Sequence, residues 1–246
     1  MPSTDHDASV WKSSELAAAY LDGIRGAIPL AAEQIDVMLR VIAARDVGVR
    51  AVLDLGCGDG LLGAAVLGAY PSAVGVFVDF SQPMLDAAAE KLRDSARRVQ
   101  LLALDYGRHD WVSQVAGSGP FDVVVSGYSI HHQTDGRKRE LYGEICDMLA
   151  PDGVFLNVEH VASASPWVTG IFDDLFVDAL HGRHLSEGGE KSRAEVAEEY
   201  YFRPDKVSNI LASVDEQCRW LREIGYADVD CYLRLLELAV FGGRKP

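Results

Sequence analysis

Three glycines and two aspartates have the types and the spacing of a ligand-binding loop. The glycines follow the apolar run at residues 52–55 and stand at Gly56, Gly58 and Gly60. Glycine permits a tight strand-to-helix turn and lets a ligand approach the backbone closely, while the amides that begin the next helix favour a carboxylate or a phosphate. Asp54 precedes the first glycine, and Asp79 ends the next apolar run, where a carboxylate can accept hydrogen bonds from both hydroxyls of a ribose. We therefore expect a ribose-containing ligand at this loop.

The same loop argues against a nicotinamide cofactor. The dinucleotide fingerprint G-x-G-x-x-G requires a glycine at the position of Leu61, and it does not require an acid where Asp54 stands. A plain strand-to-helix turn would explain the glycines alone. It would not explain the acids at the ends of the next two apolar runs, Asp79 and Asp105.

Candidate catalytic residues follow the fourth and fifth apolar runs. Tyr128, Ser129, His131 and His132 follow the fourth run, and Glu159 and His160 follow the fifth. A neutral histidine near pH 7 is a suitable general base, so we expect His131 either to act as a base or to pack and cap the next helix. Glu159 and His160 are expected either to contact the substrate or to brace neighbouring side chains.

Apolar runs alternate with helix-patterned segments along the middle of the chain. Strands are predicted at 50–55, 73–79, 99–104, 121–126 and 154–158, and helices at 60–70, 81–92 and 137–149. This alternation is typical of a doubly wound α/β fold, whose mostly parallel sheet is covered on both faces. Ligands bind at the carboxyl ends of such strands, and the candidate residues stand at those ends.

Segments without this alternation flank the predicted sheet. Helices are predicted within 13–44 with a break at Pro29, at 166–181, 192–201 and 214–224, and a hairpin at 228–241, with a polar connection at 182–191. We interpret the chain as one domain with four parts: N-terminal helices at 1–48, a core at 49–160, a helical insertion at 161–212 that covers the strand ends, and a closing helix and β-hairpin at 213–246.

The segment Asp54-Leu55-Gly56-Cys57-Gly58-Asp59-Gly60 resembles the signature of class I methyltransferases, which depend on S-adenosyl-L-methionine (SAM). The resemblance covers about residues 45–160, together with the closing helix and hairpin. It implies a Rossmann-like sheet of seven strands with the last strand antiparallel. It also implies SAM as cofactor, S-adenosylhomocysteine as product and a small molecule as methyl acceptor.

The resemblance assigns cofactor contacts to matching positions. Asp54 would organise the methionine amino end of SAM, which Ser126 and Gly127 would also touch. The residues implied to pack against the cofactor or to hold its ribose and adenine are Gly56, Cys57, Gly58, Asp79, Phe80, Met84, Asp105 and Tyr106. Tyr20 stands on an N-terminal helix that could close over the methionine end. Phe80 and Met84 would serve equally as core residues, Asp105 as a loop cap and Tyr20 as a core tyrosine.

The charge and composition restrict the partners. The 246 residues carry a formal net charge of −14, which argues against a nucleic-acid partner, and the acids of the insertion favour a neutral or cationic acceptor over a polyanionic one. No apolar run is long enough to cross a membrane. Four scattered cysteines fit reduced thiols, so we expect a cytoplasmic protein. His181 and His184 fit no metal-ligand spacing, so no metal is expected. A homodimer through the insertion or the N-terminal helices stays open.

Two alternatives to methyl transfer also stay open. The N-terminal helices, the long segment after the fifth strand and the ending at 228–243 are similar to the carboxy-SAM synthase-like branch, which modifies SAM itself and needs a cation from the insertion. Arg193 and Arg203 lie in that region, but Leu30 stands where the branch has a tyrosine after the N-terminal proline. The other alternative is a SAM-binding module without turnover. We favour methyl transfer by in-line displacement, for which the enzyme mainly aligns the nucleophile with the methyl carbon and excludes water.

Overall fold

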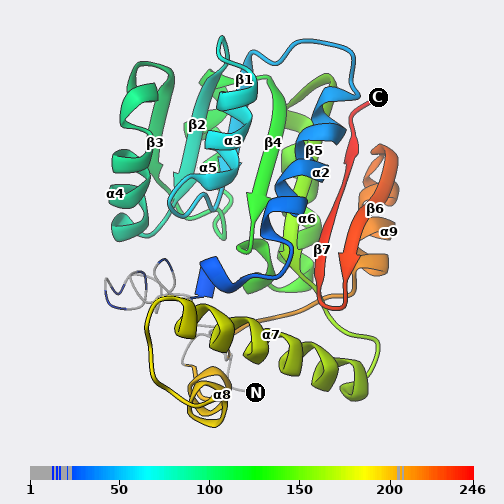
Figure 1. The fold of residues 1–246 in the computed structure, drawn as a ribbon. Helices are drawn as coiled ribbons and strands as arrows, with labels where there is room; N and C mark the ends of the chain where they lie inside the picture. The colour runs from blue at the N-terminus through cyan, green and yellow to red at the C-terminus, as the bar shows by residue number, and fades with distance from the viewer. Residues whose placement is uncertain are drawn as a thin grey trace.

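A sheet of seven strands forms the centre of the molecule, with the order β3-β2-β1-β4-β5-β7-β6 (Figure 1). The computed structural model describes residues 13, 15, 17, 21, 24–203, 206 and 208–246. The strands are β1 Ala51–Leu55, β2 Val74–Asp79, β3 Val99–Ala103, β4 Phe121–Gly127, β5 Leu149–His160, β6 Ala227–Leu235 and β7 Leu238–Arg244. The first five are parallel, whereas β7 runs antiparallel to β5 and β6. The predicted doubly wound sheet with an antiparallel last strand is therefore confirmed.

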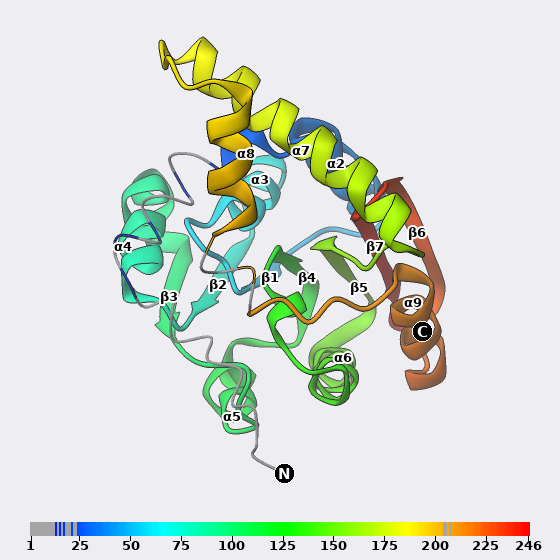
Figure 2. The same cartoon turned by 90° about the horizontal axis from the view of Figure 1, so that it is seen from below.

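Helices cover both faces of this sheet (Figure 2). On one face lie α2 Ala31–Ala43, α3 Leu61–Ala69 and α4 Gln82–Lys91, and on the other lie α5 Trp111–Val115, α6 Asp135–Met148 and α9 Val214–Ile224. Met38 and Val66 pack with Phe77 of the sheet on the first face, while Trp220 and Leu221 are buried on the second, as predicted. Two apolar cores thus hold the strand ends in fixed positions.

The insertion crosses the carboxyl ends of the strands (Figures 1 and 2). It consists of α7 Pro166–Ser186 and α8 Arg193–Tyr201. Both helices contribute to a separate apolar cluster that also includes a residue before α2 and one from β7; its buried members are Ile28, Phe172, Phe176, Val177, Tyr200 and Leu238. This small cluster places a helical cover over the sheet edge that carries the glycine loop.

The largest differences from the sequence-based prediction are in α7, α5 and β5. Helix α7 runs to Ser186, beyond the predicted end at 181, because the polar side chains there support helix; Arg183, for example, pairs with Glu187 at the i,i+4 spacing. Helix α5 was not predicted, since five residues are too few to display a helical period. Strand β5 begins at Leu149, where the backbone already pairs with β4 before a register shift. Among the described residues, no helix has the length and apolarity needed to span a membrane.

Candidate active site

The glycine loop connects β1 to α3, and its glycines at 56 and 58 both have a positive φ. Gly56 has a φ of 64°, and a Cβ added there would lie 1.9 Å from the Ser129 Oγ atom. Gly58 has a φ of 54°, but a Cβ there would meet only the Met84 Sδ atom, at 4.0 Å. The loop is tied to β2 because the Cys57 amide donates to the Val78 carbonyl at 2.9 Å. Close packing thus explains the first glycine, and the left-handed backbone the second.

Asp79 fixes the other side of the loop. Its Oδ2 atom accepts a hydrogen bond from the Gly58 amide at 2.9 Å, and its Oδ1 atom accepts one from the Ser81 amide at 2.8 Å. Burial raises the pKa of the Asp79 carboxyl, and the two amide hydrogen bonds oppose that effect. Two backbone amides therefore hold the Asp79 carboxylate in place beside the glycine loop, where a ligand bound at the loop could contact it.

Asp54 is a buried carboxylate close to the start of α3. Only 1% of its surface is exposed, and its Oδ2 atom accepts a hydrogen bond from the Gly63 amide at 2.8 Å. Burial raises the pKa of Asp54 to about 7, against the effects of this amide and of Arg25. A carboxylate that is this poorly solvated would be stabilised by a cationic ligand group next to it.

A cleft of about 990 Å³, including space open to solvent, lies over the loop. It brings together nine of the residues that sequence analysis implied for the cofactor: Asp54, Gly56, Cys57, Gly58, Asp79, Phe80, Met84, Tyr106 and Gly127. The cleft is completed by residues that the sequence did not single out, among them Arg25, Gln34 and Gln133. Neither Arg25 nor Gln34 belongs to a recognisable motif, so no signal in the sequence could have selected them.

Three implied cofactor residues do not line the cleft. Ser126 is fully buried inside β4, and its hydroxyl donates to the Leu55 carbonyl at 2.7 Å, so it joins two strands instead. Asp105 does not line it either, and its Oδ1 atom accepts from the Gly107 amide at 2.8 Å, which is the alternative role of a loop cap. Tyr20 lies outside the described residues.

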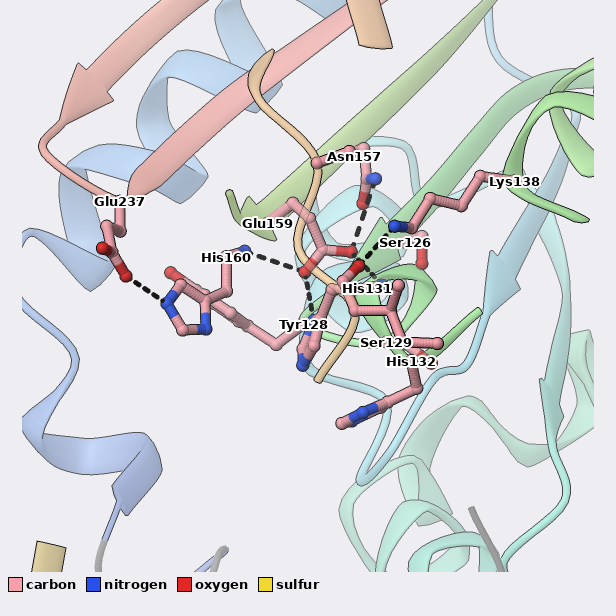
Figure 3. Close-up of polar contacts among 12 residues, drawn as sticks. Ser126, Tyr128, Ser129, His131, His132, Lys138, Asn157, Glu159, His160 and Glu237 are labelled. Carbon is pink, nitrogen blue, oxygen red and sulfur yellow. Dashed lines mark hydrogen bonds and ion pairs between the residues drawn. The ribbon is translucent and has the colours of Figure 1, made fainter. Parts of the chain in front are cut away.

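His131 and Glu159 form a buried pair at the ends of β4 and β5 (Figure 3). The His131 Nδ1 atom lies 2.6 Å from the Glu159 Oε1 atom, and the His131 amide donates to Glu159 Oε2 at 3.1 Å. Burial alone would raise the pKa of Glu159, but His131 and the His160 amide outweigh burial and hold that pKa below its usual value. The carboxylate therefore stays charged and orients the imidazole.

Two further histidines, His132 and His160, lie beside this pair. The His132 Nδ1 atom faces the Ser208 carbonyl at 3.2 Å, and burial together with His131 lowers the pKa of His132 far below its usual value. The His160 Nε2 atom lies 2.8 Å from the Glu237 Oε2 atom. Among the described residues, Glu159 lines neither the cleft nor the second cavity described below, and its carboxylate bonds His131 and the His160 amide, which favours the expected role of a brace.

A second cavity adjoins the cleft beneath the insertion. Its volume is about 570 Å³ including open space, and it is lined by Ile24, Ile28, Tyr128, His131, His132, His160, Phe172, Phe176, Tyr200, Arg203, Lys206, Asn209 and Leu238. Ile28, Tyr128 and His132 line the cleft as well. Tyr128, with a φ of 50°, donates its hydroxyl hydrogen to the Gln34 Oε1 atom at 2.6 Å. The two cavities therefore meet at a boundary that this tyrosine helps to form.

Residues 52–153 match the family model of the methyltransferase domain. The chain carries a class I, SAM-dependent methyltransferase domain. Over 230 residues it is 21% identical to the carboxy-SAM synthase of a Nitratiruptor species, covering 92% of this chain and 89% of that protein. Over 125 residues it is 31% identical to the demethylmenaquinone methyltransferase of Leptospira interrogans, covering 51% and 49%.

Solved structures show the same fold as this methyltransferase domain. An O-methyltransferase family protein from Burkholderia thailandensis superposes with a TM-score of 0.58 at 17% identity, covering 86% of this chain and 57% of that one. The matched part of this chain thus spans about half the length of the Leptospira enzyme and 57% of the Burkholderia protein.

The residues of the cleft fit SAM, the cofactor of this family. SAM carries a positive sulfonium and an α-ammonium group, and the buried Asp54 carboxylate offers the charge that such groups need. A Cβ at Gly56 would intrude on Ser129 in the wall of the cleft. Among the described residues, no group of three or more His, Cys, Asp or Glu side chains is arranged to hold a metal ion.

Proposed function

We propose that this chain transfers the methyl group of SAM to a small-molecule acceptor held in the second cavity. The observation that carries the proposal is the shared boundary of the two cavities at Ile28, Tyr128 and His132. Methyl transfer requires the nucleophile to lie in line with the methyl carbon in a site without water. Two adjoining cavities under a helical cover supply such an arrangement.

The cleft residues would hold the cofactor in two places. Asp54 would face the methionine amino end, and Asp79 would accept hydrogen bonds from the ribose at the far side of the loop. SAM, when bound, supplies a methyl carbon made electrophilic by the positive sulfur. Phe80 and Met84 line the same cleft and would contact the adenine.

His131 would act as the base for an acceptor whose nucleophile carries a proton. Its Nδ1 atom faces the Glu159 carboxylate at 2.6 Å, which fixes the proton on Nδ1 and leaves the lone pair on Nε2. Because Glu159 stays charged, it would stabilise the imidazolium that forms when His131 accepts the proton. An acceptor hydroxyl or amine in the second cavity would therefore be activated from the side of His131, which lines that cavity.

The proposal is tested with methyl-labelled SAM and a panel of small metabolites. Transfer of label to a small molecule, lost in His131→Ala but retained in a variant of a histidine outside both cavities such as His184→Ala, would support it. No transfer to any metabolite, in protein that binds SAM, would instead support the SAM-binding module without turnover.

Carboxy-SAM synthesis is a second candidate, because one relative with that name aligns along nearly the whole chain. Arg203 lines the second cavity, whereas Arg193 is exposed and pairs with Asp174 and Asp178, so of these two arginines only Arg203 could serve that chemistry. Methyl transfer is favoured because several other relatives are named methyltransferases. Mass spectrometry of ligand extracted from the purified protein separates the two, since carboxylation adds mass to SAM.

A further inference from the structure

In the part of the chain that the structure describes, the walls of the second cavity carry basic groups but no carboxylate. Arg203 and Lys206 line the cavity together with three histidines, and none of its lining residues in the described part of the chain is Asp or Glu. This is unexpected for a chain with a net charge of −14. We propose that the acceptor is a flat aromatic compound with one anionic group, which Arg203 and Lys206 bind while its nucleophile faces His131. This proposal rests on the proposed function and adds the class of substrate.

A row of rings along one wall supports a flat acceptor. The ring centroids of His160 and Phe172 lie 5.4 Å apart, those of Phe172 and Phe176 5.6 Å, and those of Phe176 and Tyr200 5.5 Å with an angle of 27° between the planes. Phe172 and Phe176 are buried, so their positions are fixed by packing. Offset and edge-to-face contacts at such spacings favour an aromatic ligand against this wall.

Tyr200 joins this wall to the basic end of the cavity. The Lys206 Nζ atom lies 3.5 Å from the Tyr200 ring centroid, and the Arg203 Cζ atom lies 5.8 Å from it. The Tyr200 hydroxyl donates to the Asp173 Oδ1 atom at 2.6 Å; burial and this carboxylate raise the pKa of Tyr200, so its hydroxyl stays neutral. Asp173 also lies 3.7 Å from the Lys206 Nζ atom and partly offsets the charge of that ammonium. A guanidinium can bind an anion through two parallel donors, so we expect Arg203 to contribute more to anion binding.

An arginine at this position suits a carboxylate in particular. The planar guanidinium offers parallel donors that match the two oxygens of a carboxylate. The cavity is only partly open to solvent, so the attraction is screened less than on the surface. Of the nearby acids of the insertion, Asp174 and Asp178 are exposed and paired with Arg193, and only Asp173 lies against one of the two cations, Lys206. The sequence favoured a neutral or cationic acceptor because it shows how many acids the insertion has, but not where their side chains lie.

Of the three histidines, His132 stands at the boundary with the cofactor cleft, and His131 lies beside it. The His131 ring centroid lies 4.0 Å from that of His132 and 5.7 Å from that of His160. His132 lines both cavities, whereas Arg203 and Lys206 line only the second. An acceptor held by its anion at Arg203 would therefore point its other end toward His131 and the cofactor cleft.

The test measures binding of three probes of similar size to the full chain saturated with S-adenosylhomocysteine. The probes are 4-hydroxybenzoate, phenol and tyramine, which are anionic, neutral and cationic. Calorimetry should show 4-hydroxybenzoate binding at least about tenfold more tightly than either other probe. Arg203→Gln should remove most of that preference and leave phenol unaffected, Lys206→Met should reduce it less, and the exposed control Arg193→Gln should change nothing.

Three results would overturn the proposal. One is phenol or tyramine binding as tightly as 4-hydroxybenzoate, or no binding of 4-hydroxybenzoate at about 1 mM. Another is an Arg203→Gln variant that keeps the full preference. The third is a carboxylated SAM in the extracted ligand, which would assign the cations to the cofactor. The saturation step separates this proposal from the proposed function, because failure to bind S-adenosylhomocysteine would refute the latter first.

Discussion

Binding of SAM should release a proton from Asp54. This carboxyl is 1% exposed, and its burial raises its pKa to about 7. Without ligand it is therefore largely protonated near pH 6. The α-ammonium group of SAM, placed beside it, would favour the charged form and lower that pKa. The affinity for SAM should accordingly rise as the pH rises toward 7.

The size of the effect follows from the pKa of about 7. If Asp54 is fully charged in the complex, close to one proton leaves at about pH 5.5 and about half a proton at about pH 7. The dissociation constant for SAM should then fall on the order of tenfold between those two pH values. The α-amino group of free SAM titrates higher, near pH 8, and so contributes little in this window.

Calorimetry in two buffers with different enthalpies of ionisation measures both the affinity and the proton release. Asp54→Asn should weaken binding and remove most of the pH dependence, with a remainder from Asp79, whose pKa is also raised by burial. Asp86→Asn, on α4 outside the cleft, is the matched control and should behave like the parent chain. A dissociation constant that is unchanged across the window, or a full pH dependence in Asp54→Asn, would refute the reasoning.

Three further predictions concern the supports of the site. Gly56→Ala should destabilise the fold by more than about 2 kcal/mol and abolish SAM binding, since its Cβ would overlap the Ser129 side chain. Gly58→Ala should cost only about 1–2 kcal/mol, because its Cβ has space and only the left-handed backbone opposes it. Thermal denaturation and calorimetry with SAM check both variants. Glu159→Gln should lower the free energy of unfolding by about 1.5–3 kcal/mol at pH 7. The pKa of Glu159 is lower in the folded than in the unfolded chain, so this loss should shrink as the pH falls below the unfolded pKa and through the folded one. Denaturant titrations at several pH values measure it. Lys138→Met should remove the buried ammonium that donates to the Ile210 carbonyl and should cost about 1–3 kcal/mol, with faster hydrogen exchange at the Ile210 amide; unchanged exchange would contradict a role in holding that segment.

The sheet and the glycine loop could be predicted because their rules are local. Apolar runs alternating with helical patterns dictate a parallel sheet, and a parallel sheet brings the carboxyl ends of its strands to one edge. Asp54, Asp79 and His131 were expected at that edge for this reason, and the structure places them there. Ser126 was expected in the cleft and is not. A strand buried on both faces has no polar alternation from which its facing could be read.

The second cavity could not be predicted, because its lining comes from segments that only tertiary packing brings together. Ile28 precedes α2, Phe172 lies on α7, Arg203 follows α8 and Leu238 begins β7. The pairing of His131 with Glu159 could not be predicted either. The sequence placed Glu159 at the end of β5, but whether its carboxylate faces the histidine or the substrate depends on the twist of the sheet and on the two amides that bond it.

A crystal structure of the chain with S-adenosylhomocysteine would test the central claim most directly. We predict that the nucleoside lies in the cleft with its ribose at Asp79, and that its sulfur faces the boundary lined by Ile28, Tyr128 and His132, opening toward the second cavity. A ligand bound elsewhere, or a sulfur turned away from that boundary, would contradict an enzyme that passes a methyl group from one cavity to the other.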